Sequence, residues 1–173
     1  SIYNDSPITL AILKLFQELE DWISMNHQYL PHGAVKAFIF GGCAFHIHTN
    51  ARGSNDIDAE IQSISQLKKE DIFLFLENND IEYLDHNNLE TNVECDSGFN
   101  TSLASIDPDY RERVIPLTAE SIVEVYLVSG VDLAVSKLAR LSDRDIEDIQ
   151  ALYARNKFSL EQFKEIANNG KDY

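Results

Sequence analysis

A short apolar run that ends in two glycines constrains the fold of this chain more than any other feature. Residues Val35 to Phe40 are nearly all apolar, which is typical of a strand buried on both faces. Gly41 and Gly42 then turn the chain, and the stretch from about Cys43 to Thr49 is predicted to be a short helix. Because glycines permit close approach and unusual dihedral angles, the bare N–H groups at this helix start can accept phosphate oxygens.

A second predicted strand, Asp56 to Ile61, carries two carboxylates and begins after the thirteen residues that follow Gly42. Side chains alternate along a strand, so Asp56 and Asp58 share one face while the apolar residues between them face the core. Two carboxylates this close repel each other unless a cation lies between them, and oxygen ligands suit Mg²⁺ or Mn²⁺. Each motif alone also occurs in ordinary turns and solvated strands, but their joint order and spacing favour a magnesium–nucleotide site.

The rest of the pattern predicts a single α/β domain over residues 1–173, with a core at about 33–130 and a helical tail at about 131–173. Ser6 and Pro7 are a typical N-cap and first residue of a helix with an apolar stripe. Capping residues also precede two tail helices, at Ser142 and Ser159. The other predicted elements are a helix at 67–78, strands at 81–84 and 91–95, a loop at 97–109, and edge strands at 114–115 and 123–128.

The composition narrows the function. The net charge of -15, from 29 acidic and 14 basic residues, repels phosphate backbones, so non-specific binding to nucleic acid is not expected. A metal ion could still bring one nucleotide to a local acidic site. No apolar run approaches the ~20 residues of a membrane helix and no secretory signal is visible, so we expect a cytoplasmic protein without membrane contact. Cys43 and Cys95 form no CxxC motif and are expected to be reduced and mostly buried.

Residues 36–62, with Gly-Gly, thirteen residues and Asp-Ile-Asp, resemble the minimal nucleotidyltransferase signature of the DNA polymerase beta-like superfamily. The resemblance implies a mixed sheet flanked by helices, a glycine turn that holds the triphosphate and an acidic pair that holds divalent metals. A second block, Asp132 to Arg140 followed by Arg144 to Ile149, is similar to the C-terminal segment of bacterial nucleotidyltransferase-like proteins related to abortive-infection toxins. Those toxins belong to toxin–antitoxin modules.

The resemblance also implies roles for individual residues. Asp56 and Asp58 would hold two Mg²⁺ ions, and either Glu94 or Asp96, which flank Cys95 on one strand face, would be the third acid. Gly41 and Gly42 would bind the nucleotide, and Ser54 loosely matches a Ser or Thr that many relatives have just before the acidic pair. By their own charge and position, Arg52 on the same loop and Lys137 are candidate triphosphate contacts, and Lys137 is also a candidate catalytic residue.

Three of these assignments have structural alternatives. Arg52 and Ser54 could cap the turn instead of binding phosphate. Lys137 lies near the apolar face of its predicted helix, where a lysine needs a partner. It could extend its amine to solvent, or form an ion pair with Asp145 or Asp148.

We therefore expect a magnesium-dependent nucleotidyltransferase that moves a nucleoside monophosphate from an NTP to an RNA or protein acceptor. The family context suggests the toxin of a toxin–antitoxin module, with a cognate antitoxin as partner. The alternatives are a lapsed enzyme that still binds a nucleotide, a partner protein of such a module, and a transferase that modifies a sugar or antibiotic. His46 and His48 diverge on a helix, so packing or surface roles are expected for them rather than metal binding.

Overall fold

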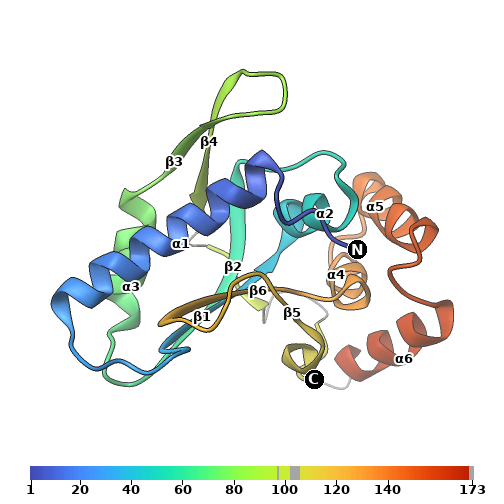
Figure 1. Ribbon diagram of the computed structural model, residues 1–173. Helices are drawn as coiled ribbons and strands as arrows, with labels where there is room; N and C mark the ends of the chain where they lie inside the picture. The colour runs from blue at the N-terminus through green and yellow to red at the C-terminus, as the bar shows by residue number, and fades with distance from the viewer. Residues whose placement is uncertain (97, 102–105, 172–173) are drawn as a thin grey trace.

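A six-stranded mixed sheet forms the centre of the computed structural model, which describes residues 1–96, 98–101 and 106–171. Its strands lie in the order β3-β4-β2-β1-β6-β5 (Figure 1). The strands are β1 (Val35–Phe40), β2 (Asp56–Ser63), β3 (Ile81–Leu84), β4 (Glu90–Cys95), β5 (Ile115–Pro116) and β6 (Val123–Leu127). The helices are α1 (Pro7–Asn26), α2 (Gly41–Thr49), α3 (Lys69–Asn78), α4 (Gly130–Ser136), α5 (Asp143–Ala154) and α6 (Leu160–Lys171), with a 3-10 helix η2 (Tyr110–Arg113).

The strand pairing confirms the predicted α/β class with a mixed sheet. Strand β1 is antiparallel to β2 and parallel to β6, and β2 is parallel to β4. The prediction that 123–128 forms an edge strand is wrong, because β6 lies between β1 and β5. Four of its five residues are buried, as an internal strand requires, and the edge is the two-residue β5, which ends in Pro116.

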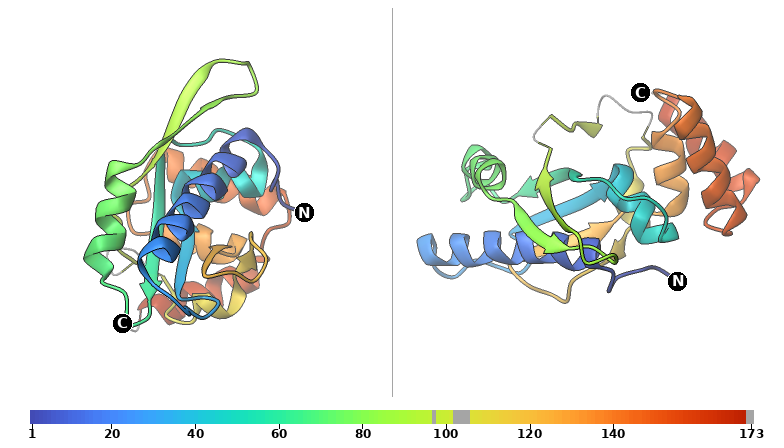
Figure 2. Two further views of the ribbon diagram at one scale, coloured as in Figure 1. Left: turned by 60° about the vertical axis from the view of Figure 1, so that its left-hand side comes forward. Right: turned by 90° about the horizontal axis from the view of Figure 1, so that it is seen from above.

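Helix α1 crosses one face of the sheet and buries its apolar stripe there (Figures 1 and 2). As predicted, Ser6 is its N-cap, with Oγ accepting a hydrogen bond from Thr9 N at 3.4 Å, and Pro7 follows at the first helical position. Trp22 near the end of α1 stacks on Phe75 of α3, with ring centroids 5.1 Å apart. These contacts fix the face of the sheet that α1 covers; on the other face, Phe38 and Phe40 pack against Tyr110 of η2, beside the polar side chains of β2.

The C-terminal helices α4, α5 and α6 lie together beyond the end of β6 (Figure 1). Ser142 and Asp145 form the predicted capping box of α5. Ser159 Oγ accepts a hydrogen bond from Gln162 N at 3.1 Å, so the start of α6 also has the predicted cap. Phe158 stacks on Phe163 with ring centroids 5.2 Å apart, which adds a hydrophobic staple.

Two other predictions concern segments outside the regular elements. The loop predicted at 97–109 lies partly outside the described residues; of its described parts, 98–101 and 106–109, Thr101 has 3-10 helical conformation and the rest form no helix or strand. Cys43 and Cys95 are free and buried, as expected. Within the described ranges, no helix is both long and apolar enough to cross a bilayer.

Candidate functional site

The turn between β1 and α2 is built against the acidic strand. Gly41 has φ +65°, a conformation that side chains rarely adopt, and a Cβ there would collide with Asp58 Oδ2. A Cβ on Gly42 would lie 2.9 Å from Ser54 Cβ. Phe40 pairs with Asp58 in the β1–β2 register, which brings the glycines beside this carboxylate. Both glycines are therefore required by close packing against β2 and its preceding loop.

The predicted acids lie on one face of the sheet. Asp56 pairs with Glu94 and Ile57 pairs with Cys95 across β2 and β4. Paired residues share a face and neighbours alternate, so Asp56, Asp58 and Glu94 lie opposite the buried Ile57 and Cys95. Asp96 follows the end of β4 and donates its backbone N–H to Ile57 O at 2.8 Å. The acidic face is the one that α1 does not cover.

Asp58 and Asp96 contact each other directly. Partial burial of Asp58, the charge of Asp96 and a hydrogen bond to it raise the pKa of Asp58 to about 6. Asp56 raises the pKa further, whereas Lys137 lowers it. Of the two candidates for the third acid, Asp96 is the one that reaches Asp58, while Glu94 is exposed opposite Asp56.

The cations beside the acids share one buried carboxylate. Lys137 Nζ lies 2.9 Å from Asp148 Oδ2, and Arg52 Nη2 lies 2.6 Å from Asp148 Oδ1. Both cations also lie over the Phe45 ring: Lys137 Nζ is 5.7 Å and Arg52 Cζ is 5.1 Å from the ring centroid. Of the two structural alternatives for Lys137, the structure shows the ion pair with Asp148 rather than an amine extended to solvent, and Lys137 is near enough to Asp58 to lower the pKa of that carboxyl.

Asp148 is the residue that sequence reasoning did not place at the site. The sequence predicts it only as a structural partner of Lys137, although it lies in the family-like block that ends in Ile149. The other candidate partner, Asp145, binds Arg140 Nε at 2.8 Å and caps α5, and these bonds hold its pKa well below the ordinary range. Ser54 Oγ accepts from Asp56 N at 3.1 Å, so it caps the turn before the acidic strand.

A second ion-pair network holds α4, and with it Lys137, in place. Asp132 is fully buried and accepts two hydrogen bonds from Arg113, from Nε at 2.9 Å and from Nη2 at 2.8 Å. Arg113 also bonds Asp107 at 2.7 Å, and these carboxylates raise its pKa. Ser129 caps α4 and bonds Asp132 Oδ2 at 2.5 Å. The buried bidentate pair links η2 to the helix that ends at Lys137.

The residues present fit a divalent metal in donor chemistry. The donors are carboxylate oxygens, which hard cations prefer, and a cation would relieve the repulsion that raises the pKa of Asp58. Among the described side chains, however, no three His, Cys, Asp or Glu groups already converge on one metal position. Other oxygens, such as those of a nucleotide phosphate, would then complete the coordination.

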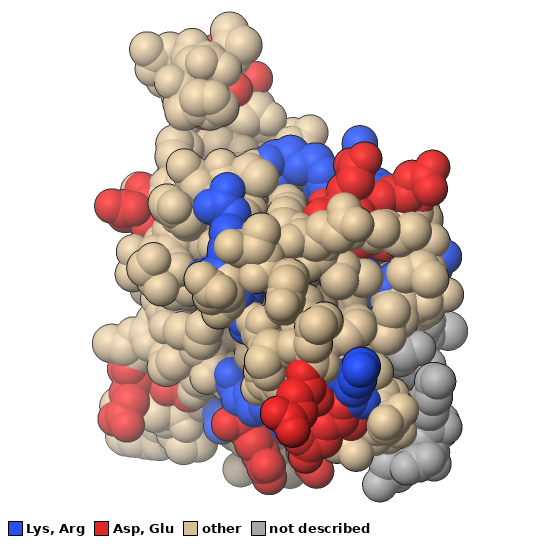
Figure 3. Space-filling model, turned by 90° about the vertical axis from the view of Figure 1, so that its right-hand side faces the viewer, with Lys and Arg blue, Asp and Glu red and all other residues tan. Residues whose placement is uncertain are grey.

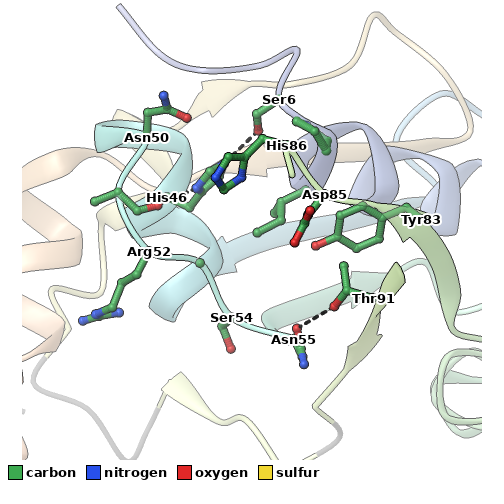
Figure 4. Close-up of a pocket in the computed structure, with 14 residues that line it drawn as sticks. Ser6, His46, Asn50, Arg52, Ser54, Asn55, Tyr83, Asp85, His86 and Thr91 are labelled. Carbon is green, nitrogen blue, oxygen red and sulfur yellow. Dashed lines mark hydrogen bonds between the residues drawn. The ribbon is translucent and has the colours of Figure 1, made fainter. Parts of the chain in front are cut away.

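The two histidines of α2 make structural contacts. His46 lies between Ser6 Oγ and Ala51 O, each 2.8 Å from a ring nitrogen. His48 is buried with Nε2 2.8 Å from Val128 O, and burial lowers its pKa to about 4. A cavity next to His46 lies on the α1 side of the sheet, away from the acids (Figure 4).

This arrangement defines a class of protein: an α/β fold in which a strand–glycine–helix turn faces an acidic pair on the adjacent antiparallel strand. A family model described as "Nucleotidyltransferase of unknown function (DUF6036)" matches residues 11–173. The chain therefore belongs to this nucleotidyltransferase family. Comparison with curated proteins gives no match.

Proposed function

We propose that this protein is a magnesium-dependent nucleotidyltransferase that moves a nucleoside monophosphate from an NTP to an acceptor hydroxyl. The observation that carries the proposal is the convergence of Asp58 and Asp96 beside the Gly41–Gly42 turn, with Lys137 close by. Family membership supports the same general activity. Ordinary packing would not require three carboxylates to share a face at mutual electrostatic cost.

In the proposed reaction, the acceptor oxygen attacks the α-phosphorus, the bond to the bridging oxygen breaks, and pyrophosphate leaves. Backbone N–H groups at the start of α2 would bind phosphate oxygens. Lys137 and Arg52 would offset the phosphate charge, because one carboxylate, Asp148, neutralises only one of these two cations. Asp96 would take the proton from the acceptor hydroxyl.

Asp56, Asp58 and Asp96 would hold the metal ions in this proposal. Bound Mg²⁺ or Mn²⁺ would supply charge neutralisation for the attacking and leaving oxygens. Ile57, Ala59 and Ile61 are buried on the opposite face of β2, so the acids stay on one side of the strand. Glu94, exposed at the outer end of the row, would have a secondary role at most.

The charge distribution favours an RNA acceptor over an acidic protein. Residues 1–136 hold 22 acidic and seven basic residues, whereas residues 137–173 hold seven of each. Figure 3 shows Lys and Arg side chains spread between the acidic ones on the face that carries the C-terminal helices. A polyanion would therefore meet the least repulsion along α5 and α6, next to Lys137.

The test is transfer of label from each α-labelled NTP onto RNA and protein extracts, with and without Mg²⁺. Wild-type protein should label an acceptor, and Asp58→Asn and Asp96→Asn should not. Failure of every NTP to label any acceptor would contradict the proposal. Tight Mg²⁺–NTP binding without transfer would instead support a lapsed enzyme that retains the site.

The resemblance of the second block extends the proposal to the toxin of a toxin–antitoxin module, with a cognate antitoxin as partner. Induced expression of the wild-type chain in bacteria should then slow growth, and expression of Asp58→Asn to the same level should not. Equal growth of the two strains would count against the toxin role.

A further inference from the structure

A cavity of about 640 Å³ lies between the start of α1, the loop over residues 50–55 and the β3–β4 hairpin (Figure 4). We propose that this cavity is a second binding site, which takes a small organic cation bearing an ammonium or guanidinium group. Its volume lies within the range of small-molecule sites. The proposal does not depend on the nucleotidyl-transfer reaction.

The cavity is separate from the acidic site because the sheet lies between them. Tyr83 of β3 pairs with Thr91 of β4, and both line the cavity on the face that α1 covers. Asn55 contributes its side chain to the same side, with Oδ1 accepting from Thr91 Oγ1 at 3.4 Å. Asp56, the next residue, points to the opposite face. A ligand bound at Asp85 therefore lies on the opposite face of the sheet from the Asp58–Asp96 pair, while Arg52 and Ser54 of the loop before β2 also border the cavity.

A fixed carboxylate marks the hairpin wall of the cavity. Asp85 Oδ1 accepts the backbone N–H groups of Asn87 at 2.8 Å and Leu89 at 3.0 Å, which anchor the side chain to its own turn. In the described part of the chain, Asp85 Oδ2 has no hydrogen-bond partner and is available to a ligand. Burial and the charges of Cys43 and Asp85 raise the pKa of Tyr83, so the phenol next to this carboxylate stays neutral.

The charge balance of the walls selects a cation. Among the described residues that line the cavity, Arg52 is the only Lys or Arg, and Figure 4 shows its side chain directed away from the cavity, where its guanidinium binds Asp148. A phosphate or carboxylate ligand would thus meet the charge of Asp85 with no compensating Lys or Arg. An ammonium or guanidinium group could bind Asp85 and lie against the rings of Tyr83 and His86. The net charge of -15 also raises the local concentration of cations.

Calorimetry on the full chain tests the proposal with agmatine, spermidine and glucosamine as cationic probes and AMP as an anionic one. Asp85→Asn keeps an Oδ1 acceptor for the turn and removes the charge, so it should weaken binding of a cationic probe about tenfold or more. His86→Ala changes an exposed side chain and should weaken binding about two- to fivefold. The matched control is Glu82→Gln on the same hairpin, outside the cavity lining, which should change affinity less than about twofold.

Any one of three results would contradict the proposed site. No saturable binding of any cationic probe to the wild-type chain excludes it. Equal loss in Asp85→Asn and Glu82→Gln would mean diffuse attraction to an acidic surface rather than a site. Tighter binding of AMP than of agmatine would show that the ligand class is wrong. Circular dichroism melting of each variant confirms that the hairpin variants remain folded.

Discussion

Removal of the Asp148 charge is the perturbation that most directly tests how the cations beside the acidic site are held. Asp148→Asn keeps the volume of the side chain but leaves two cations without their shared anion. The Lys137 side chain is only 9% exposed, whereas that of Arg52 is 35% exposed and partly screened by solvent. The loss should therefore come mainly from the buried ammonium group of Lys137.

Breaking a buried ion pair by removing one partner costs roughly 3–5 kcal/mol. Because asparagine still accepts a hydrogen bond, we expect Asp148→Asn to lower the free energy of unfolding by about 3 kcal/mol. For a chain of this length the melting midpoint should then fall by roughly 6–12 °C. Urea denaturation measures the free energy directly, with an unchanged m-value as evidence that the folded state is intact.

A double-mutant cycle separates the ion pair from a packing defect. Lys137→Met removes the buried cation with a side chain of similar length, so adding it to Asp148→Asn should recover about half of the loss or more. Arg144→Gln is the control, because Arg144 is exposed on the same helix as Asp148 and forms no ion pair within the described ranges, so it should change the free energy of unfolding by less than about 0.5 kcal/mol. A loss below about 1 kcal/mol in Asp148→Asn, or no recovery in the double variant, would refute the ion-pair explanation.

Three further predictions concern the turn, the acidic pair and a buried histidine. Gly41→Ala should lower the free energy of unfolding by about 1–3 kcal/mol, because the added Cβ would overlap Asp58 Oδ2. It should also abolish the rise in melting midpoint that Mg²⁺ and NTP produce. Gly170→Ala in α6 is the control and should not destabilise the chain. The pKa of about 6 for Asp58 indicates repulsion in its charged form, so Asp58→Asn should raise the free energy of unfolding at pH 7 by about 1 kcal/mol after allowance for solvent screening. The same variant should lose Mg²⁺-dependent nucleotide binding. A destabilised variant would contradict the inferred repulsion. His48 has its pKa lowered to about 4 in the folded state, so its contribution is present above pH ~6.5 and is lost as the pH falls to about 4. Denaturation across this window should show a loss of up to roughly 3 kcal/mol that His48→Gln reduces; an equal slope in the variant would assign the loss to other groups.

Local features of the sequence predict much of the fold. Strand β1, the glycine turn and the acidic start of β2 follow from apolar runs, glycine positions and alternation, all of which act over a few residues. The caps of α1, α5 and α6 are equally local, because each capping side chain bonds a backbone group three residues away. These parts of the prediction are confirmed for that physical reason.

Long-range packing decided what local patterns left open. The contact of Asp96, rather than Glu94, with Asp58, the pairing of Lys137 with Asp148, and the internal position of β6 each depend on contacts between segments distant in sequence. The cavity at Asp85 likewise joins three segments, at residues 6–8, 46–55 and 83–91, with no pattern in common. The sequence by itself determined which chemical groups the chain has and their local structure, and the tertiary structure decided which of them meet.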